Sequence, residues 1–317
     1  MVQFGTFVPQ GWRLDLQHVK GAANQWATVR RVASKLEEIG YESLWLYDHF
    51  HTVPKTKIEP TFECWTTMAA LATLTSKVRL GQLVTCSLYR NPAYLAKVAS
   101  CVDVISGGRV DLGIGAGWKD DEFAAYGYNF PPIRERLERM AETARIVKAM
   151  FTEERATVEG THHRVDGAYN NPKPVRGDIP ILIGGSGERK TLRMVAQYGD
   201  GCNVFGDPER FQYLMGVLDQ HCEDVGRDPS EITRTTMATV VVTATQEDAE
   251  RKKAAALEAG MPRERVEAAW IGDADTVAER ARAYRDVGVQ GMTIVMPDAY
   301  DLEAIAMAGR ALGPVFG

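Results

Sequence analysis

Apolar and polar residues alternate along the chain in two recurring ways, as short β-rich runs and as longer stretches with helical spacing. The short runs predict eight strands, at residues 2–8, 43–47, 78–85, 109–115, 179–184, 201–205, 234–243 and 290–296. Between the strands, residues 24–39 and 92–105 each place apolar side chains on one helical face. Strands and helices are therefore expected to alternate throughout.

Such alternation favours a parallel sheet covered by helices, and eight units within 317 residues favour a closed (β/α)₈ TIM barrel over an open, doubly wound sheet. Two segments are longer than the alternation of one strand and one helix requires. Residues 152–176 predict a hairpin and a Pro-rich connector before the fifth strand, and residues 244–274 predict a helical excursion after the seventh. Because no linker interrupts the pattern, we expect one domain over residues 1–317.

Composition and charge narrow the classes of function. The net charge is −5 with no Lys/Arg-rich run, so nucleic acid is not an expected partner. The sequence shows neither a signal peptide nor the roughly 18 to 20 consecutive apolar residues that cross a bilayer, so we expect a cytoplasmic protein without a membrane partner. The five cysteines form no C-x-x-C motif, and His162 and His163 are expected at the surface, so no metal site is predicted.

Polar residues follow the second predicted strand abruptly, in the sequence "YESLWLYDHFH" at residues 41–51. The C-terminal ends of barrel strands build the active site, so Asp48 and His49 are candidates to face a pocket there. An imidazole exchanges protons near neutral pH, and a neighbouring carboxylate orients it or supports its charged form. The dipeptide alone fits equally an Asp that caps a turn beside a core histidine.

Glycines mark the ends of two further strands. Gly113, Gly115 and Gly117 alternate at the fourth strand, where a flat ring or a phosphate-bearing chain would explain a need for close approach to the backbone. Residues 184–187, "GGSG", form a turn before a helix expected to begin near Glu188. Free N–H groups at a helix N-terminus bind anions, so we favour a phosphate site there over a plain left-handed turn.

These strand ends resemble the luciferase-like monooxygenase superfamily, and more narrowly its branch that uses the deazaflavin coenzyme F420. The resemblance rests on "SLWLYDHF" (43–50), "YRNPAYLAKVASCVDVISGGRVDLGIGAGW" (89–118), "EFAAYGYNFPP" (122–132) and "PILIGGSG" (180–187). It implies a barrel whose coenzyme ring lies across the mouth, with its phosphate on the fifth-strand loop. It also implies a bulge with a non-prolyl cis peptide in the third strand, matched here by Leu83-Val84.

The resemblance further implies that His49 is catalytic and works beside the ring with Asp48. The residues expected to contact the coenzyme are Asp48, His49, Leu83, Val84, Thr85, Cys86, Gly115, Ala116, Gly117, Trp118, Gly184, Gly185, Ser186 and Gly187. Relatives are often homodimers, and we expect the same here. The substrate is expected to be a small organic molecule.

The chain departs from the sugar-phosphate dehydrogenases of this branch. They carry Glu where Trp118 stands, and Lys shortly after the sixth strand, where this chain has Phe205-Gly206-Asp207. Trp118 offers an aromatic wall suited to an apolar or planar substrate. Two other functions stay open: an FMN-dependent monooxygenase of the same fold, and a flavin- or deazaflavin-binding protein without turnover.

Overall fold

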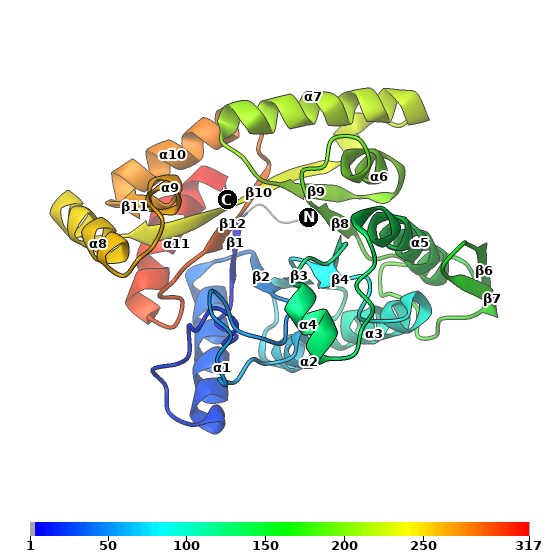
Figure 1. The fold of residues 1–317 in the computed structure, drawn as a ribbon, viewed down its shortest axis with the longest axis horizontal. Coiled ribbons are helices and arrows are strands. Elements are labelled where there is room, and N and C mark those ends of the chain that lie inside the picture. The colour runs from blue at the N-terminus through cyan, green and yellow to red at the C-terminus, as the bar shows by residue number, and fades with distance from the viewer. Residues whose placement is uncertain (1–3, 317) are drawn as a thin grey trace.

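The computed structural model describes residues 4–316, and its central feature is a closed ring of parallel strands (Figure 1). The eight barrel strands are, in order, β1 (Phe4–Phe7), β2 (Ser43–Leu46), β3 (Arg79–Gln82), β5 (Val110–Gly115), β8 (Ile181–Gly184), β9 (Gly201–Val204), β10 (Thr233–Val242) and β12 (Gly291–Val295). The ring closes where β12 pairs with β1, with Met292 opposite Phe4. The predicted (β/α)₈ barrel is confirmed, and each of the eight predicted strands has a counterpart; residues 2 and 3 of the first predicted strand lie outside the described residues.

The third predicted strand is interrupted. Residues 78–85 were expected to be continuous, whereas β3 ends at Gln82 and a two-residue strand, β4 (Thr85–Cys86), pairs separately with β5. The peptide bond between Leu83 and Val84, which lies in the interruption, is cis. The predicted bulge is therefore present at the predicted residues.

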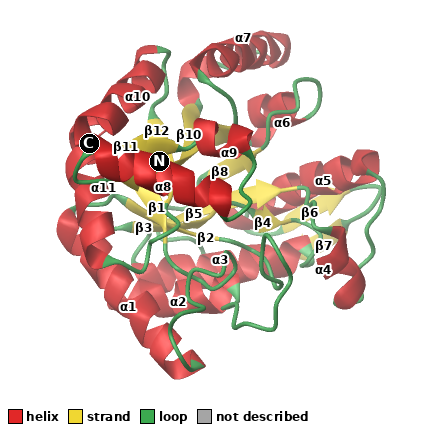
Figure 2. Ribbon diagram, turned by 60° about the vertical axis from the view of Figure 1, so that its left-hand side comes forward, coloured by secondary structure: helices red, strands yellow, loops and turns green. Residues whose placement is uncertain are grey.

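Helices surround the strands, as the red ribbons around the yellow arrows show (Figure 2). They are α1 (Ala22–Ile39), α2 (Cys64–Leu74), α3 (Pro92–Ser106), α4 (Asp120–Ala125), α5 (Ile133–Thr152), α6 (Thr191–Tyr198), α7 (Pro208–Val225), α10 (Ala274–Asp286) and α11 (Leu302–Phe316), with a 3₁₀ turn at Pro229–Glu231. The Asn91 side chain caps α3 by accepting the Ala93 N–H, and Gly40 ends α1 in the left-handed region. Within residues 4–316, no helix is both long enough and apolar enough to cross a membrane.

The barrel wall separates two apolar clusters. Alternate residues of a strand face opposite sides, so Leu44 and Leu46 join the large core beneath the helices, whereas Trp45 belongs to a smaller cluster inside the barrel. The indole of Trp45 occupies space beside its neighbours: a Cβ on Gly5 would lie 2.8 Å from Trp45 Nε1, and one on Gly81 would lie 2.5 Å from Cζ3. One large side chain between two glycines thus occupies part of the barrel interior, together with the other residues of the smaller cluster.

Both predicted insertions are present. The first is the antiparallel hairpin of β6 (Ala156–Glu159) and β7 (Arg164–Ala168), which packs against α5. Its turn is tied down by Glu142, whose carboxylate accepts backbone N–H groups of Thr161, His162 and His163. The second comprises α8 (Gln246–Glu258), α9 (Arg263–Ala268) and a strand that the pattern did not predict, β11 (Trp270–Gly272), which extends the sheet beside β10.

Candidate active site

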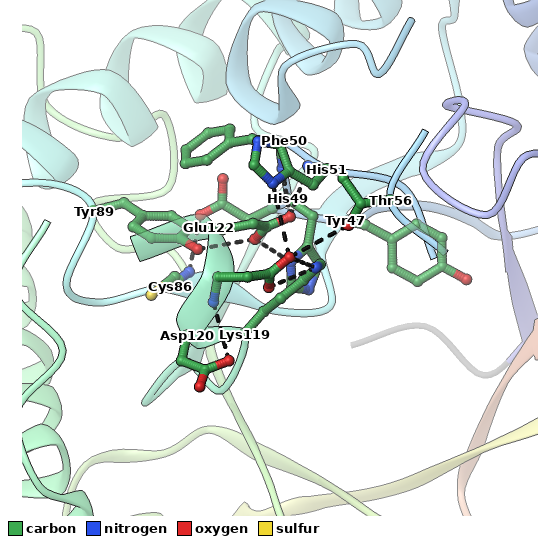
Figure 3. Close-up of polar contacts among 12 residues, drawn as sticks. Tyr47, His49, Phe50, His51, Thr56, Cys86, Tyr89, Lys119, Asp120 and Glu122 are labelled. Atoms are coloured by element: carbon green, nitrogen blue, oxygen red, sulfur yellow. Dashed lines mark hydrogen bonds and ion pairs between the residues drawn. The ribbon is translucent and has the colours of Figure 1, made fainter. Parts of the chain in front are cut away.

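The histidine that follows β2 is held by a carboxylate from another part of the chain. His49 Nδ1 lies 2.8 Å from Oε2 of Glu122, which belongs to α4 just after β5. Figure 3 shows Glu122 beside the loop that carries His49, Phe50 and His51. The sequence left open whether the neighbouring Asp48 orients the imidazole; in the structure the Asp48 carboxylate instead binds Arg90 and the backbone N–H of Cys86.

Glu122 is buried, and its carboxylate contacts four hydrogen-bonding groups. Its Oε1 accepts the backbone N–H groups of Phe50 (2.9 Å) and His51 (2.8 Å), and its Oε2 also accepts the Tyr89 hydroxyl (3.0 Å). Burial alone would raise the pKa of Glu122, but the hydrogen bonds from His49 and from the two backbone N–H groups outweigh it, and the pKa lies below its ordinary value of 4.5. The carboxylate is therefore ionised around neutral pH.

Two tryptophans fix the imidazole from other directions. The Trp12 ring is stacked on the His49 ring, with centroids 4.3 Å apart and planes 4° apart. Trp118, which follows β5, meets His49 edge-on at 5.5 Å and 68°. Trp12 is buried, whereas 61% of Trp118 is exposed. Trp12 thus covers one face of the His49 ring, and the partly solvent-exposed Trp118 borders the ring on another side.

Asp48 links the ends of two strands. It is 2% exposed, it accepts two hydrogen bonds from the Arg90 guanidinium at 2.7 and 3.0 Å, and it accepts the backbone N–H of Cys86 at 2.9 Å. Arg90 also reaches Glu63 at 2.8 Å. These contacts join the end of β2 to β4 and to the start of α2, so Asp48 supports the segment that carries His49.

Protein atoms occupy the space beside the glycines at the end of β5. A Cβ on Gly113 would overlap the carbonyl oxygen of Gln82, and one on Gly115 would overlap a methyl group of Val84. A Cβ on Gly117 would lie 2.8 Å from Cys86 Sγ. The interrupted third strand thus accounts for the glycine spacing by itself, and contact of Gly115, Ala116 and Gly117 with a coenzyme ring stays a prediction.

The loop after β8 differs in one respect from the expectation. Helix α6 begins at Thr191, three residues later than predicted, after a turn at residues 188–190. Gly185 has a φ of 127°, and Ser186 Oγ accepts the backbone N–H of Phe205 at 2.9 Å, which ties this loop to the end of β9. Gly184, Gly185 and Ser186 are half-buried and Gly187 is exposed, so a ligand can reach the turn.

Unpaired polar atoms lie near the strand ends. Thr85 Oγ1, Ser87 Oγ and Asn203 Oδ1 are buried and have no hydrogen-bond partner within residues 4–316. Buried polar atoms are ordinarily paired, and unpaired ones cost free energy. Asn203 faces the barrel interior, because Cys202 and Val204 on either side of it join the outer core. The barrel mouth therefore fits a ligand with several hydrogen-bonding groups, as a flavin-type ring has.

A reactive thiol is not part of this site. Cys86 is among the residues expected near the coenzyme, and burial raises the pKa of its thiol to about 12. A thiol with that pKa is protonated at neutral pH and is a poor nucleophile. The arrangement instead suits proton transfer at His49 combined with binding of a polar ring.

Sequence reasoning overlooked Glu122, Trp12 and Tyr89. Glu122 begins the segment 122–132, which carries part of the resemblance. It could have been identified as a site candidate because it is an acidic residue only four positions after Trp118, close to a strand end. Trp12 follows β1, and the rule that strand ends build the site also applies to it. No local sequence pattern marks Tyr89 as a site residue, because only the fold brings its hydroxyl to Glu122.

Comparison with known proteins identifies the family of the chain. Residues 2–310 match the profile of the family described as luciferase-like monooxygenase. An uncharacterized protein of Mycobacterium tuberculosis is 29% identical over 55% of this chain and 66% of its own length. The F420-dependent glucose-6-phosphate dehydrogenase of Kineococcus radiotolerans is 32% identical over 68% of this chain and 65% of its own. In both cases, the match spans slightly less than two thirds of the relative.

Solved structures share the fold. An F420-dependent secondary alcohol dehydrogenase in complex with an F420-acetone adduct superimposes with a TM-score of 0.83 at 18% identity, covering 99% of each chain. The oxygenating constituent of 3,6-diketocamphane monooxygenase from Pseudomonas putida, in complex with FMN, gives a TM-score of 0.75 at 16% identity, covering 100% of this chain and 99% of the other. At these identities, the likeness concerns the fold.

Proposed function

Because the chain belongs to the luciferase-like monooxygenase family, we propose that it is an oxidoreductase that uses coenzyme F420 to move a hydride to or from a small organic molecule. The observation that carries the proposal is His49, an imidazole held by a buried carboxylate at the mouth of the barrel. Relatives named as F420-dependent dehydrogenases support the choice of coenzyme.

The residues present fit such a coenzyme. The unpaired Asn203 Oδ1 and Thr85 Oγ1 offer hydrogen bonds to a polar ring. In the turn at residues 184–187, the Gly185 N–H donates to the Asn203 carbonyl at 3.0 Å, so the backbone N–H groups of Ser186 and Gly187 are those offered to a phosphate. When bound, the deazaflavin supplies the hydride chemistry, and the chain supplies orientation and exclusion of water. His49 then gives or takes the proton that accompanies the hydride.

Trp118 favours an apolar or planar substrate. Its exposed indole stands beside His49, where the sugar-phosphate dehydrogenases of the branch carry a carboxylate. The neighbouring Lys119 is buried and paired with Asp121 at 2.5 Å, so it does not offer a free charge to a substrate phosphate. An indole contributes a large, flat apolar surface.

A titration distinguishes F420 from FMN, which is the coenzyme bound to one of the structural neighbours. We expect the apoprotein to bind F420 at least tenfold more tightly than FMN, a difference of about 1.4 kcal/mol. Fluorescence titrations at one salt concentration measure both affinities. Equal or tighter binding of FMN would favour the monooxygenase of the same fold.

Turnover tests the role of His49. We expect His49→Ala to lower kcat by about 10² to 10⁴, while the affinity for the coenzyme changes much less. The matched control is His18→Ala: His18 is exposed, and its ring packs against Tyr300. Unchanged turnover of His49→Ala would rule out proton transfer by His49 and leave a binding protein or a different mechanism.

A further inference from the structure

We propose that Glu122 is a positioning residue that decides which nitrogen of His49 carries the proton. In this assignment Nδ1–H donates to Glu122, and Nε2 is the nitrogen that exchanges a proton with the substrate. The role in turnover rests on the proposed function, whereas the position of the proton in the resting protein does not.

The hydrogen bonds around Glu122 leave its carboxylate only the role of acceptor. Two of its partners, the backbone N–H groups of Phe50 and His51, can only donate, and they occupy Oε1. Burial raises the pKa of Tyr89, so this phenol keeps its proton and donates to Oε2. The Glu122 side chain is fully buried, so no water competes for these oxygen atoms. His49 Nδ1, at 2.8 Å from Oε2, is therefore a donor.

The orientation of the ring leaves Nε2 for chemistry. Trp12 covers one face of the imidazole, and Glu122 occupies the Nδ1 side. Within the described residues 4–316, His49 Nε2 has no hydrogen-bond partner. The His49 side chain is 14% exposed, so a substrate can approach it. A neutral imidazole with Nδ1–H presents a lone pair at Nε2, and a protonated one presents N–H there. Glu122 supports both forms without taking the proton itself.

The substitution Glu122→Gln tests this assignment with little change in shape. The amide oxygen of Gln can still accept the N–H groups of Phe50 and His51, but its NH₂ group then faces His49 Nδ1, which must accept. The proton of a neutral His49 should move to Nε2. By analogy with other carboxylate-oriented histidines, we expect kcat to fall by about 10² to 10⁴.

Nitrogen-15 NMR of the histidine side chains in the coenzyme-free protein reads the tautomer directly. We expect the Nδ1–H form for His49 in the parent and the Nε2–H form in Glu122→Gln. The control is Asp121→Asn on the same helix: Asp121 pairs with Lys119 and lies 3.8 Å from His51, so the His49 tautomer should not change.

An Nε2–H tautomer in the parent, or an unchanged tautomer in Glu122→Gln, would overturn the assignment. If Glu122→Gln does not fold, the spectrum of the parent decides alone. The outcome is separate from that of the proposed function, because an Nδ1–H tautomer combined with full turnover of His49→Ala would overturn only the latter.

Discussion

Val84 and Gly115 lie so close that a Cβ on the glycine would overlap Cγ2 of the valine. Val84 belongs to the interruption between β3 and β4, and Gly115 ends β5. Gly184 ends β8, the strand that pairs with β5 on its other side, and a Cβ on Gly184 would lie 2.8 Å from Val84 Cγ1. The Val84 side chain thus packs against the ends of β5 and β8. It fits there only because both strands end in glycine.

Gly115→Ala should therefore destabilise the fold. Overpacking a filled site costs about 1 to 3 kcal/mol, which a denaturant titration measures. Gly216→Ala is the matched control: Gly216 lies within α7, has no atom within 4 Å of its Cβ position, and should gain about 0.5 to 1 kcal/mol from the better helix former. Equal stability of Gly115→Ala and the parent would show that Val84 moves aside freely.

Asp48→Asn should also lower the free energy of unfolding. Only 12% of the Arg90 side chain is exposed, and it would lose its charged partner and one of the two acceptor oxygens, because an amide has a single oxygen, while keeping Glu63. Breaking a buried pair costs about 3 to 5 kcal/mol, and the remaining partner places our expectation near 3 kcal/mol. As a control, Glu38→Gln removes an exposed pair with Lys35 and should cost less than about 1 kcal/mol. A similar loss in both variants would contradict a supporting role for Asp48.

Ser186→Asp should weaken the binding of phosphorylated flavins. The new carboxylate would repel a phosphate held by the turn at residues 184–187, and it can still accept the Phe205 N–H. Riboflavin, which lacks the phosphate, provides the control ligand. We expect the affinity for FMN to fall tenfold or more, about 1.4 kcal/mol, while that for riboflavin changes little. A parallel loss for both ligands would place the phosphate elsewhere.

The hairpin of β6 and β7 should open in acid. Burial raises the pKa of Glu142, but hydrogen bonds from the backbone N–H groups of residues 161–163 outweigh it, and the pKa lies below its ordinary value of 4.5. A carboxyl with a lowered pKa contributes stability that is present above pH 4.5 and is lost as pH falls through the folded-state pKa. The protection factors of the amides at residues 161–163, which are exchange rates corrected for the slower intrinsic exchange in acid, should therefore fall in that window.

Glu142→Gln provides the comparison for the hairpin. An amide oxygen can accept hydrogen bonds at every pH, so the acid-dependent part of the exchange should be absent in this variant. If the parent and Glu142→Gln show the same pH dependence, another group controls the opening of the turn.

Local patterns were sufficient for the fold. Strands such as residues 43–47 and helix ends such as Asn91 and Gly40 carry their signals within a few residues, so the alternation predicted the closed barrel. The site was predicted less completely, because partners depend on which strand ends meet. His49 was identified, but Asp48 beside it in sequence points to Arg90, while Glu122, 73 residues away, provides the carboxylate.

The glycine pattern has a physical cause that the sequence alone did not reveal. The spacing of Gly113, Gly115 and Gly117 signalled close approach to the backbone, and the approach exists. The approaching atoms belong to Gln82, Val84 and Cys86, residues of the same chain. A single sequence does not distinguish a neighbour in the fold from a ligand, because both require the same absence of a side chain.

The stacking of Trp12 on His49 gives the protein an internal optical reporter. The chain has six tryptophans, and within the part that the structure describes, the two that contact His49 are Trp12 and Trp118. A charged imidazolium quenches the emission of an adjacent indole more strongly than the neutral ring does. The intrinsic fluorescence of the protein should therefore follow the proton on His49 without any added label.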